Sequence, residues 1–311
     1  MSSEEPRIPH DRGHILWTSE GGPERLLLAS FDRWTTSILG DDGITDLIMA
    51  EGPTMNAKIV AKQNGIIAGC AAVDYMLQIW CPDIHVTWQA NDGKSIQSGD
   101  TLARLKGSAQ SLLRMERSIL NILGQLSGIA TETNRWAKIA PKQIACTRKT
   151  VWGILDKWAV HVGGGLTHRL HKSDARMIKE NDLAAMQSEG QNHAERLSSY
   201  LSTVQDGEYG AFLEVEVRTA KEAMIAAGMW KSLGKEAKLV IMLDNLSPKE
   251  CKEIAEEMEQ YDLRQHVVLE ASGGITFEQL SDWKECTLDV LSTSALNRGT
   301  QPLDISMLFD E

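Results

Sequence analysis

Apolar and polar positions alternate differently in the two parts of the chain, and this change of rhythm predicts two architectures. Residues 55–107 mix β-branched segments with polar turns. NAKIVAKQNGIIAGC has β-branched residues on both sides of Asn64-Gly65, which predicts a hairpin. AAVDYMLQIWC predicts a helix, and HVTWQANDGKSIQSGDTLARLKG predicts short strands separated by glycine turns. Together these segments predict a small α+β unit.

One long amphipathic helix is predicted next, from about Ser108 to Ile139. Arg117 is one of its polar residues, and a solvated charge on the helix face is the plain interpretation of it. The apolar residues recur at helical spacing and form one face. They are Leu112, Met115, Ile119, Ile122, Leu123 and Leu126.

Beyond residue 140, short apolar runs alternate with helical stretches, which predicts a parallel sheet built from βα units. Clear helices are predicted at residues 220–233 and 248–261, whereas the first connections are short. Seven runs are candidate strands: QIACTRKT, AVHVGGG, ARMIKEN, AFLEVEV, KLVIMLDN, HVVLEASGG and LDVLSTSA.

Length, charge and cysteine content narrow the class of protein. A chain of 311 residues forms one or two domains. Its net charge of -11 argues against nucleic acid or a membrane surface as partner, although a locally basic pocket can still bind a small anion. Five scattered cysteines without a CxxC pair argue against disulfides or structural zinc and fit a reducing compartment. There is no signal-peptide core and no apolar run of roughly 18 residues, so we expect a cytoplasmic protein.

Polar residues lie within or at the end of five of the predicted strands. In an α/β barrel the C-terminal ends of the strands form the active-site face. The repeated pattern therefore predicts one site assembled around a barrel mouth. Its residues are Arg148, Lys149, Lys179, Glu216, Asp244, Ser272, Gly273 and Gly274.

The cations of this predicted mouth indicate an anionic ligand. Arginine pairs well with carboxylates and phosphates because its planar fork donates two parallel hydrogen bonds, and lysine suits phosphate oxygens. Several cations in one pocket repel one another unless an anion neutralises them, so the ligand carries several negative charges. The cations are Arg148, Lys149, Arg169 and Lys179, with His168 nearby.

The acids at the same mouth leave several interpretations open. Glu214 and Glu216 share one face of the strand EVEV because side chains alternate with period two, so either can point inward. Glu216 and Asp244 suit ribose hydroxyls, a magnesium ion, or a positive charge that develops on a sugar carbon. The plainer alternative for each is an ion pair with Lys149 or Lys179.

Two segments are candidate phosphate sites. In EASGGI, Ser272, Gly273 and Gly274 expose backbone N–H groups after a strand. The second set of donors follows the final strand, where phosphate sites are frequent in α/β barrels. These donors are Ser292, Thr293 and Ser294.

VGGGLTHR is interpreted as a substrate-recognition segment. We expect Gly163–Gly165 to let the chain turn tightly and approach the ligand, with His168 and Arg169 close behind them in the sequence. Walker A and GxGxxG motifs are absent. Cys146 lacks an evident partner base, so we interpret it as a packed core thiol. The nine tryptophans have no period, so packing is the default for each.

The motifs also occur together in a known family. In order and spacing they resemble quinolinate phosphoribosyltransferase, the carboxylating nicotinate-nucleotide pyrophosphorylase, from about residue 45 to about residue 296. The resemblance implies an N-terminal α/β sandwich domain, residues 1–115 joined by the tail 297–311, and an incomplete seven-stranded parallel α/β barrel, residues 116–296. The motifs are MERSILNILGQLSGIAT, TRKT, VGGGLTHR, MIKEND, EVEV, IMLDN and EASGGI.

The resemblance implies a concrete reaction. Quinolinate and phosphoribosyl pyrophosphate are joined with magnesium to give nicotinate mononucleotide, carbon dioxide and pyrophosphate, a step of de novo NAD biosynthesis. It also implies a homodimer in which the N-terminal part of one subunit closes the barrel of its partner. Arg117 then reaches the partner's pocket.

Roles for the site residues follow from the same resemblance. Glu216 and Asp244 would contact the ribose and its magnesium and stabilise an oxocarbenium-like charge. Lys149 and Lys179 would meet phosphate and pyrophosphate oxygens. Quinolinate would be held by Arg117, Arg148, Lys149, His168 and Arg169.

Three positions depart from the family's pattern. Trp152 replaces a proline in VWGILDKW, which also lacks an arginine and two residues. Asp182 replaces a histidine, and Ser294 replaces a glycine in the last phosphate segment. These changes bear on substrate choice and rate rather than on the class of reaction.

Other functions compete with this interpretation. A related phosphoribosyltransferase could act on nicotinate or another heterocyclic acid, and the same scaffold could serve a non-catalytic binding protein. A lipoyl or biotinyl carrier would explain the rhythm around Lys94, but Lys94 follows Asp92-Gly93 and no MKM or DKA triplet is present.

Overall fold

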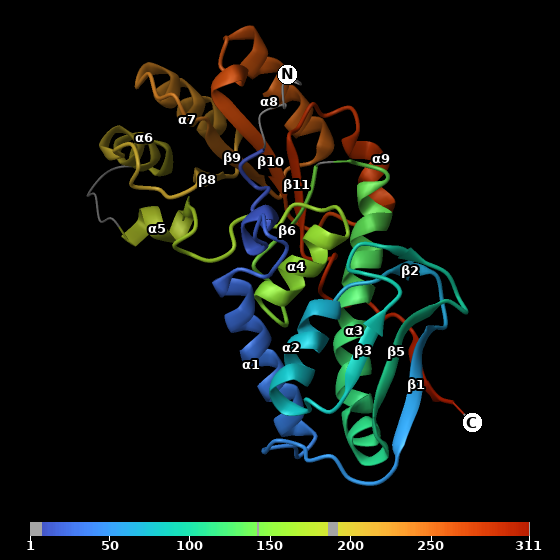
Figure 1. Cartoon of the computed structure of the whole chain (residues 1–311). Helices are drawn as coiled ribbons and strands as arrows, with labels where there is room; N and C mark the ends of the chain where they lie inside the picture. Colours follow the sequence, from blue (N-terminus) through green and yellow to red (C-terminus); the bar gives the residue numbers. More distant parts are fainter. Residues whose placement is uncertain (1–7, 142, 186–191, 311) are drawn as a thin grey trace. The chain divides into compact units, whose positions relative to one another are not determined.

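The computed structural model describes residues 8–141, 143–185 and 192–310 (Figure 1). The chain packs into two compact units. The described residues of the barrel unit lie within 1–12, 139–148 and 166–295, and those of the sandwich unit lie within 13–138, 149–165 and 296–311. The expected domain boundary at residues 115 and 116 falls inside the helix α3 (Ala109–Ala137), which belongs to the sandwich unit along its whole length.

The barrel unit is built on a six-stranded parallel sheet that curls into a half-barrel (Figure 1). The order of its strands is β6-β11-β10-β9-β8-β7, so the first two strands in the sequence form its edges. The pattern of apolar runs predicted this parallel sheet, and the resemblance implied that its barrel is incomplete. The strands are β6 (Ile144–Cys146), β7 (Arg176–Ile178), β8 (Leu213–Val217), β9 (Leu239–Asp244), β10 (Val267–Ser272) and β11 (Val290–Thr293).

Helices connect these strands in the βα rhythm read from the sequence. Helix α8 has a strong start signal, because Ser247 and Glu250 form a reciprocal capping box and Pro248 occupies the first turn. The predictions of helices over 220–233 and 248–261 are confirmed. The helices are α5 (Glu180–Ala185), α6 (His193–Thr203), α7 (Ala220–Ser232), α8 (Pro248–Gln260) and α9 (Leu280–Trp283).

One strand prediction is wrong. AVHVGGG was expected to form a strand, but its first half belongs to the helix α4 (Ile154–Val162) of the sandwich unit. A short buried apolar run has no period that separates a strand from a helix. In the barrel unit Leu166 instead makes one isolated parallel bridge to Ala145 of β6. The sheet of the described chain therefore has six strands rather than seven, and Leu166 extends its β6 edge.

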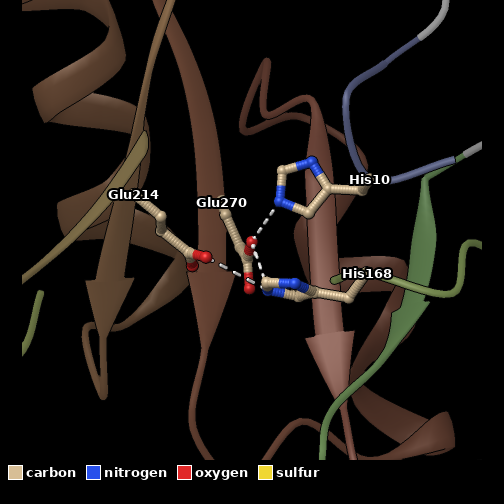
Figure 2. A group of neighbouring side chains, drawn as sticks. All are labelled: His10, His168, Glu214 and Glu270. Carbon is tan, nitrogen blue, oxygen red and sulfur yellow. Dashed lines mark hydrogen bonds and ion pairs between the residues drawn. The ribbon is translucent and has the colours of Figure 1, made fainter. Parts of the chain in front are cut away.

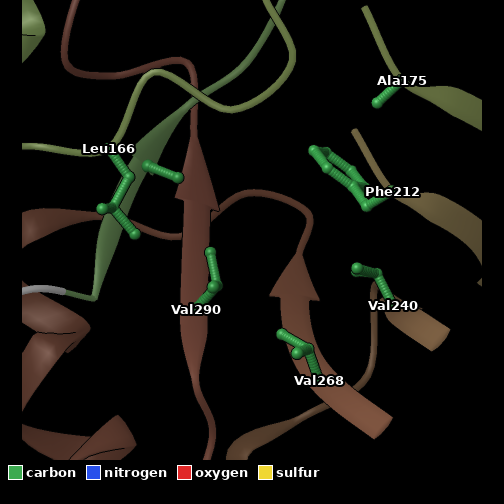
Figure 3. Packing of buried hydrophobic residues seen from close by; sticks show 7 residues of the cluster. Leu166, Ala175, Phe212, Val240, Val268 and Val290 are labelled. Atoms are coloured by element: carbon green, nitrogen blue, oxygen red, sulfur yellow. The ribbon is translucent and has the colours of Figure 1, made fainter. Parts of the chain in front are cut away.

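The interior of the half-barrel begins with an apolar layer (Figure 3). Each strand or the residue just before it contributes one buried side chain, and Leu166 adds another beside β6. Such layers fill the inside of parallel barrels. The members are Ala145, Leu166, Ala175, Phe212, Val240, Val268 and Val290.

The sandwich unit carries an antiparallel sheet in the order β12-β1-β5-β3. The C-terminal strand β12 (Ile305–Phe309) pairs with β1 (Thr54–Ala61), and β1 pairs with β5 (Thr101–Ser108). The strand β3 (His85–Trp88) completes the sheet at its other edge.

Helices complete the sandwich unit. Gly128 in α3 lets the backbone approach closely, because a Cβ there would overlap the carbonyl oxygen of Gln301. The prediction of one long helix over 108–139 is confirmed by α3, and that of a helix over AAVDYMLQIWC by α2 (Cys70–Trp80). Helix α1 (Arg25–Asp41) and the short 3-10 helix Gly13–Leu16 lie in the part of the sequence that gave no clear pattern. Among the described helices, none has the length and hydropathy that a membrane span needs.

The predicted hairpin at Asn64-Gly65 does not form. The strand β2 (Gly65–Ile66) pairs with β4 (Ser95–Ile96) in a separate two-stranded sheet, whereas β1 pairs with β5 and β12. The side chain of Asn64 accepts a hydrogen bond from the backbone of Ser98. This long-range contact holds the turn toward β4, so tertiary pairing overrides the local turn signal.

Candidate active site

Most of the predicted site residues of the barrel unit lie at the C-terminal edge of the parallel sheet. Lys179 follows β7, Glu216 lies near the end of β8, and Asp244 ends β9. Ser272 ends β10 and Ser292 lies near the end of β11. Because all six strands run parallel, these ends share one edge, which is where active sites of this architecture lie.

Lys179 and Glu216 form a close ion pair. The side chain of Glu216 is 9% exposed, whereas that of Lys179 is 47% exposed. The acid is therefore fixed in the sheet, and the base reaches it from the rim. This is the ion pair predicted as the plainer alternative, and it places a half-exposed cation beside a buried carboxylate.

Asp244 has a cationic partner that the sequence analysis did not name. Nε of Arg218 lies 3.7 Å from the Asp244 carboxylate, and Arg218 also pairs closely with Glu180. The side-chain amide of Asn245 donates a 2.9 Å hydrogen bond to Asp244. Arg218 directly follows β8, so the rule of polar residues after strands could have identified it.

Two arginines are close enough to repel each other. Burial and the charge of Arg148 both lower the pKa of Arg169. Arg169 is 7% exposed and donates to the carbonyl of Ala175, whereas Arg148 is exposed. The charges of Glu214 and Asp182 act in the opposite direction. An anion placed between the two guanidinium groups would relieve their repulsion, so the pair suits a carboxylate ligand.

The three glycines of VGGGLTHR lie where the chain turns and packs closely against α3. A Cβ on Gly163 would overlap the Ala130 carbonyl of α3, and one on Gly165 would lie 2.6 Å from the Thr133 side chain. Gly164 has a positive φ of 89°. The glycines therefore turn the chain, as predicted, but their close approach is to α3.

His168 lies inside the half-barrel in a cluster of four buried titratable side chains (Figure 2). Its Nε2 is 3.3 Å from Glu270 and 3.5 Å from Glu214. Glu270 also meets Nε2 of His10 at 2.7 Å. His10 packs against Phe212 of the apolar layer with ring centroids 4.9 Å apart, so the cluster lies directly on that layer.

The strands explain this placement. Every second side chain from Phe212, just before β8, points to the same face of the sheet. Phe212 contributes to the apolar layer, Glu214 to the buried cluster and Glu216 to the rim. Val268 and Glu270 do the same on β10. Successive inward positions of one strand thus change from apolar to acidic toward the C-terminal edge.

Charge interactions shift the proton affinity of each group in the cluster. Burial lowers the pKa of His168, but the carboxylates of Glu214 and Glu270 outweigh it and raise the pKa to about 10. Burial raises the pKa of Glu214. For Glu270 burial acts the same way, but His168 and His10 outweigh it and lower the pKa. The two buried acids therefore differ, and Glu270 is the one held ionised.

The backbone N–H of Arg169 lies 2.7 Å from Nδ1 of His168 and donates to it. A lone pair on Nδ1 places the ring proton on Nε2, where it faces the two carboxylates. The hydrogen bond from Arg169 disfavours a proton on Nδ1, whereas the carboxylates of Glu214 and Glu270 favour the doubly protonated, positively charged ring. In either charge state Nε2 carries a proton.

The cluster offers ligand types that a metal ion can use. Two imidazole nitrogens and two carboxylate oxygens lie within 4.8 Å of one another. To bind a metal ion through Nε2, His168 would have to carry its proton on Nδ1 instead. The backbone N–H of Arg169 donates to Nδ1 and so disfavours a proton there. The arrangement therefore fits a hydrogen-bonded network better than a metal centre.

The candidate phosphate segments differ in how many donors they leave available. Gly273 and Gly274 both have positive φ, at 108° and 61°. The hydroxyl of Thr293 already donates to the carbonyl of Ile275 at 2.9 Å, whereas the buried hydroxyl of Ser292 has no hydrogen-bond partner within the described chain. Ser294 is partly exposed. The backbone of Gly273 and Gly274 and the hydroxyl of Ser292 are therefore better candidates for phosphate binding than the hydroxyl of Thr293.

Arg117 and Lys149 belong to the sandwich unit. Arg117 is exposed on α3 and borders a cavity of about 590 Å³ within that unit, together with Trp152. Trp152 stacks with Trp34 at a centroid distance of 6.0 Å. The grouping of Arg117 and Lys149 with the residues of the barrel unit stays a prediction.

Asp182 and Cys146 have structural contacts. Asp182 accepts a 2.9 Å hydrogen bond from the backbone of Lys179 and so caps the first turn of α5. Cys146 is 1% exposed, and its Sγ lies 3.4 Å from the carbonyl of Thr167. The prediction of a packed thiol is confirmed.

Comparisons with known proteins place the chain in a family. The model of the quinolinate phosphoribosyl transferase C-terminal domain matches residues 129–308, and that of the N-terminal domain matches residues 42–127. The chain belongs to the quinolinate phosphoribosyltransferase family.

Relatives of known name agree over most of the chain. A protein of Archaeoglobus fulgidus named "Probable nicotinate-nucleotide pyrophosphorylase (carboxylating)" is 35% identical over 260 residues, which cover 81% of this chain and 93% of that one. A mitochondrial quinolinate phosphoribosyltransferase (decarboxylating) of Nicotiana tabacum is 34% identical, covering 82% and 73%. The solved nicotinate-nucleotide pyrophosphorylase of Francisella tularensis superposes with a TM-score of 0.76 at 27% identity, covering 91% and 97%.

Within this quinolinate phosphoribosyltransferase family member, sequence reasoning missed His10 and Glu270. His10 lies before the region that the family models match, in a segment without a readable pattern. Glu270 interrupts the apolar run VVLEAS. A charged residue in the middle of a buried parallel strand is a signal that could have identified it.

Proposed function

We propose that the protein is a quinolinate phosphoribosyltransferase, which converts quinolinate and phosphoribosyl pyrophosphate to nicotinate mononucleotide, carbon dioxide and pyrophosphate. The observation that carries the proposal is the agreement of both family domains and of the named relatives over most of the chain. The charges at the C-terminal edge of the sheet support it, since arginines, lysines and acids meet there.

The arginine pair suits the dicarboxylate substrate. Arg148 and Arg169 repel each other in the unliganded protein, and quinolinate would replace this repulsion with charge-assisted hydrogen bonds. His168 follows Gly163–Gly165 in the same segment, but it is nearly fully buried and hydrogen-bonded to acids. We assign it a positioning role, because its side-chain Nδ1 accepts the hydrogen bond from the backbone N–H of Arg169.

Lys179 and Glu216 would separate when substrate binds. Pyrophosphate oxygens would form ion pairs with Lys179, whose side chain is half exposed, while Glu216 stays in the sheet. The freed carboxylate would then face the positive charge that develops on the ribose as pyrophosphate leaves. Preorganised charges of this kind usually make the largest contribution to catalysis.

Carboxylate oxygens at the ends of β8 and β9 fit a magnesium ion. Magnesium prefers hard oxygen ligands and is usually bound through one or two carboxylates and substrate phosphates. Glu216 and Asp244 supply such oxygens, and Lys179 and Arg218 now neutralise them. A bound ion would neutralise the pyrophosphate charge. Phosphate groups would meet the backbone of Gly273 and Gly274 and the hydroxyl of Ser292.

We also propose that the enzyme is a homodimer with a shared site. Arg117 would then serve the barrel of the neighbouring subunit. Mixing Arg117→Ala with an inactive Glu216→Gln variant should restore part of the activity, because one of the two sites in a mixed dimer is intact. Absence of any recovery, with subunit exchange demonstrated, would contradict the shared site.

A direct assay tests the reaction. The purified protein is incubated with phosphoribosyl pyrophosphate, magnesium and either quinolinate or nicotinate, and nicotinate mononucleotide is separated by chromatography. Carboxyl-labelled quinolinate should release labelled carbon dioxide in step with product. Product from nicotinate but none from quinolinate would refute the proposal.

A further inference from the structure

A second cavity lies entirely within the sandwich unit, and no step of the proposed reaction uses it. Its volume is about 600 Å³, which is within the range of small-molecule binding sites. The walls come from α2, from the segment after β3, from the end of α4 and from Trp17. Three of the nine tryptophans line it, so packing alone does not account for their positions.

The tryptophans of this cavity are held in fixed orientations. Trp17 stacks on Trp158 with ring centroids 5.0 Å apart and an angle of 11° between the planes. The indole N–H of Trp158 donates to Asp92 at 3.2 Å, and that of Trp88 donates to Asp74 at 2.8 Å. Trp17 and Trp88 are half-buried, so part of each ring stays accessible beside the cavity.

The hydrogen bonds that the described residues make to the two carboxylates of the cavity come from neutral groups. Asp92 accepts hydrogen bonds from the backbone of Cys70 at 2.9 Å and from Trp158. Burial raises the pKa of Asp92, and burial raises that of Asp74, to which the charge of Asp92 adds. Of the described residues that line the cavity, none is a lysine or an arginine, and His161 is its histidine. Two carboxylates in such a lining disfavour anions such as quinolinate and phosphoribosyl pyrophosphate.

We propose that this cavity binds an organic cation, either a quaternary ammonium or a protonated amine with a small apolar body. A cation over an indole face is attracted by the electrons of the ring, and Trp17 and Trp88 line the cavity with half-buried side chains. The carboxylates of Asp74 and Asp92 add a direct charge attraction. The binding site is independent of the barrel edge, so the inference stands whether or not the proposed reaction is correct.

Titration calorimetry with matched probes tests the proposal. Choline and benzyltrimethylammonium are the cationic probes, and 3,3-dimethyl-1-butanol is the neutral isostere of choline. We expect both cations to bind one site per chain and the neutral alcohol to bind at least about tenfold more weakly. Equal binding of choline and the alcohol, or no binding of either cation, would overturn the proposal.

Variants locate the site. Asp74→Asn and Trp88→Leu should each weaken choline binding by roughly tenfold, while Trp88→Phe should keep most of the affinity because an aromatic face remains. Asp46→Asn is the matched control, since Asp46 is an exposed acid of the same unit away from the cavity, and it should leave binding unchanged. Phosphoribosyl transfer should be unaffected in all four variants. Full choline affinity in folded Asp74→Asn and Trp88→Leu proteins would refute the assignment.

Discussion

The strands β8 and β5 show how differently the two units treat charged residues. β5 alternates, so that Arg104 and Lys106 are exposed while Leu102, Ala103 and Leu105 are buried. In β8 all five residues are buried, including Glu214 and Glu216. Antiparallel sheets commonly keep one face in water, whereas parallel sheets are covered on both faces. A charge on β5 is therefore ordinary, and a charge on β8 requires a function or a partner.

The difference teaches where to look for function in this fold. Burying a charge costs free energy unless partners compensate it. The barrel unit buries Glu214, Glu216, Glu270 and His168 on the inner side of its sheet, immediately below and at the edge where the candidate site lies. In the sandwich sheet, Arg104 and Lys106 are exposed and Lys58 is half-buried. The four predictions below test this contrast.

The largest effect is expected from Glu270→Ala. The variant leaves His10 and His168 buried without their shared acid, and removal of one member of a buried charge pair costs about 3–5 kcal/mol of stability. Arg104→Ala on β5 should change stability by no more than about 0.5 kcal/mol. Urea unfolding followed by circular dichroism measures both. Similar losses in the two variants would remove the contrast between the strands.

Glu216→Gln should chiefly affect catalysis. Loss of one preorganised charge commonly lowers kcat by about 10²–10³, and the amide keeps the shape of the side chain. Lys106→Gln on β5 is the control, and its kcat should stay unchanged. Steady-state kinetics with quinolinate and phosphoribosyl pyrophosphate separates kcat from KM. A normal kcat in Glu216→Gln would exclude Glu216 from the reaction.

Local patterns were sufficient to predict most elements of the fold. The long helix, the βα rhythm and the strand ends were readable because period and turn residues agreed. AVHVGGG was predicted wrongly because its apolar run lacks a period. The hairpin at Asn64-Gly65 was predicted wrongly because β1 pairs with β12, which lies about 250 positions away in the sequence. Long-range pairing leaves no local signal.

The rim of the candidate site was easier to predict than its interior. Lys179, Glu216 and Asp244 lie after or at the ends of strands, where the architecture itself supplies the rule. His10 comes from a segment without pattern, and its contact with Glu270 joins positions 260 residues apart. Only the fold brings these two together, so no spacing in the sequence could reveal the cluster.

Arg169→Ala should produce a smaller effect than Glu216→Gln, and on binding rather than on turnover. Loss of a charge-assisted hydrogen bond costs about 1.5–3 kcal/mol, so the KM for quinolinate should rise by roughly 10–100-fold. Arg169→Lys keeps the charge without the planar fork and should recover part of the affinity. The KM for phosphoribosyl pyrophosphate should change little. An unchanged KM for quinolinate in Arg169→Ala would remove Arg169 from the site.

The smallest effect concerns an acid of the sandwich unit, Asp83, whose pKa moves opposite to that of Glu214. Burial acts to raise the pKa of Asp83, but hydrogen bonds from the backbone of Ser108 and the hydroxyl of Ser111 outweigh it and lower the pKa. A lowered folded-state pKa stabilises the protein above the unfolded value of 3.8, and this contribution is lost as pH falls through the folded value. Asp83→Asn should therefore cost about 1 kcal/mol at pH 7 and less below pH 3.8.

Glu214→Gln should show the opposite trend, because a raised pKa stabilises only at low pH and its contribution is lost as pH rises through 4.5 and above. Unfolding midpoints of the two variants relative to the wild type, measured from pH 3 to pH 8, should diverge in opposite directions. Parallel curves would mean that the surroundings of Asp83 and Glu214 shift the two pKa values in the same direction.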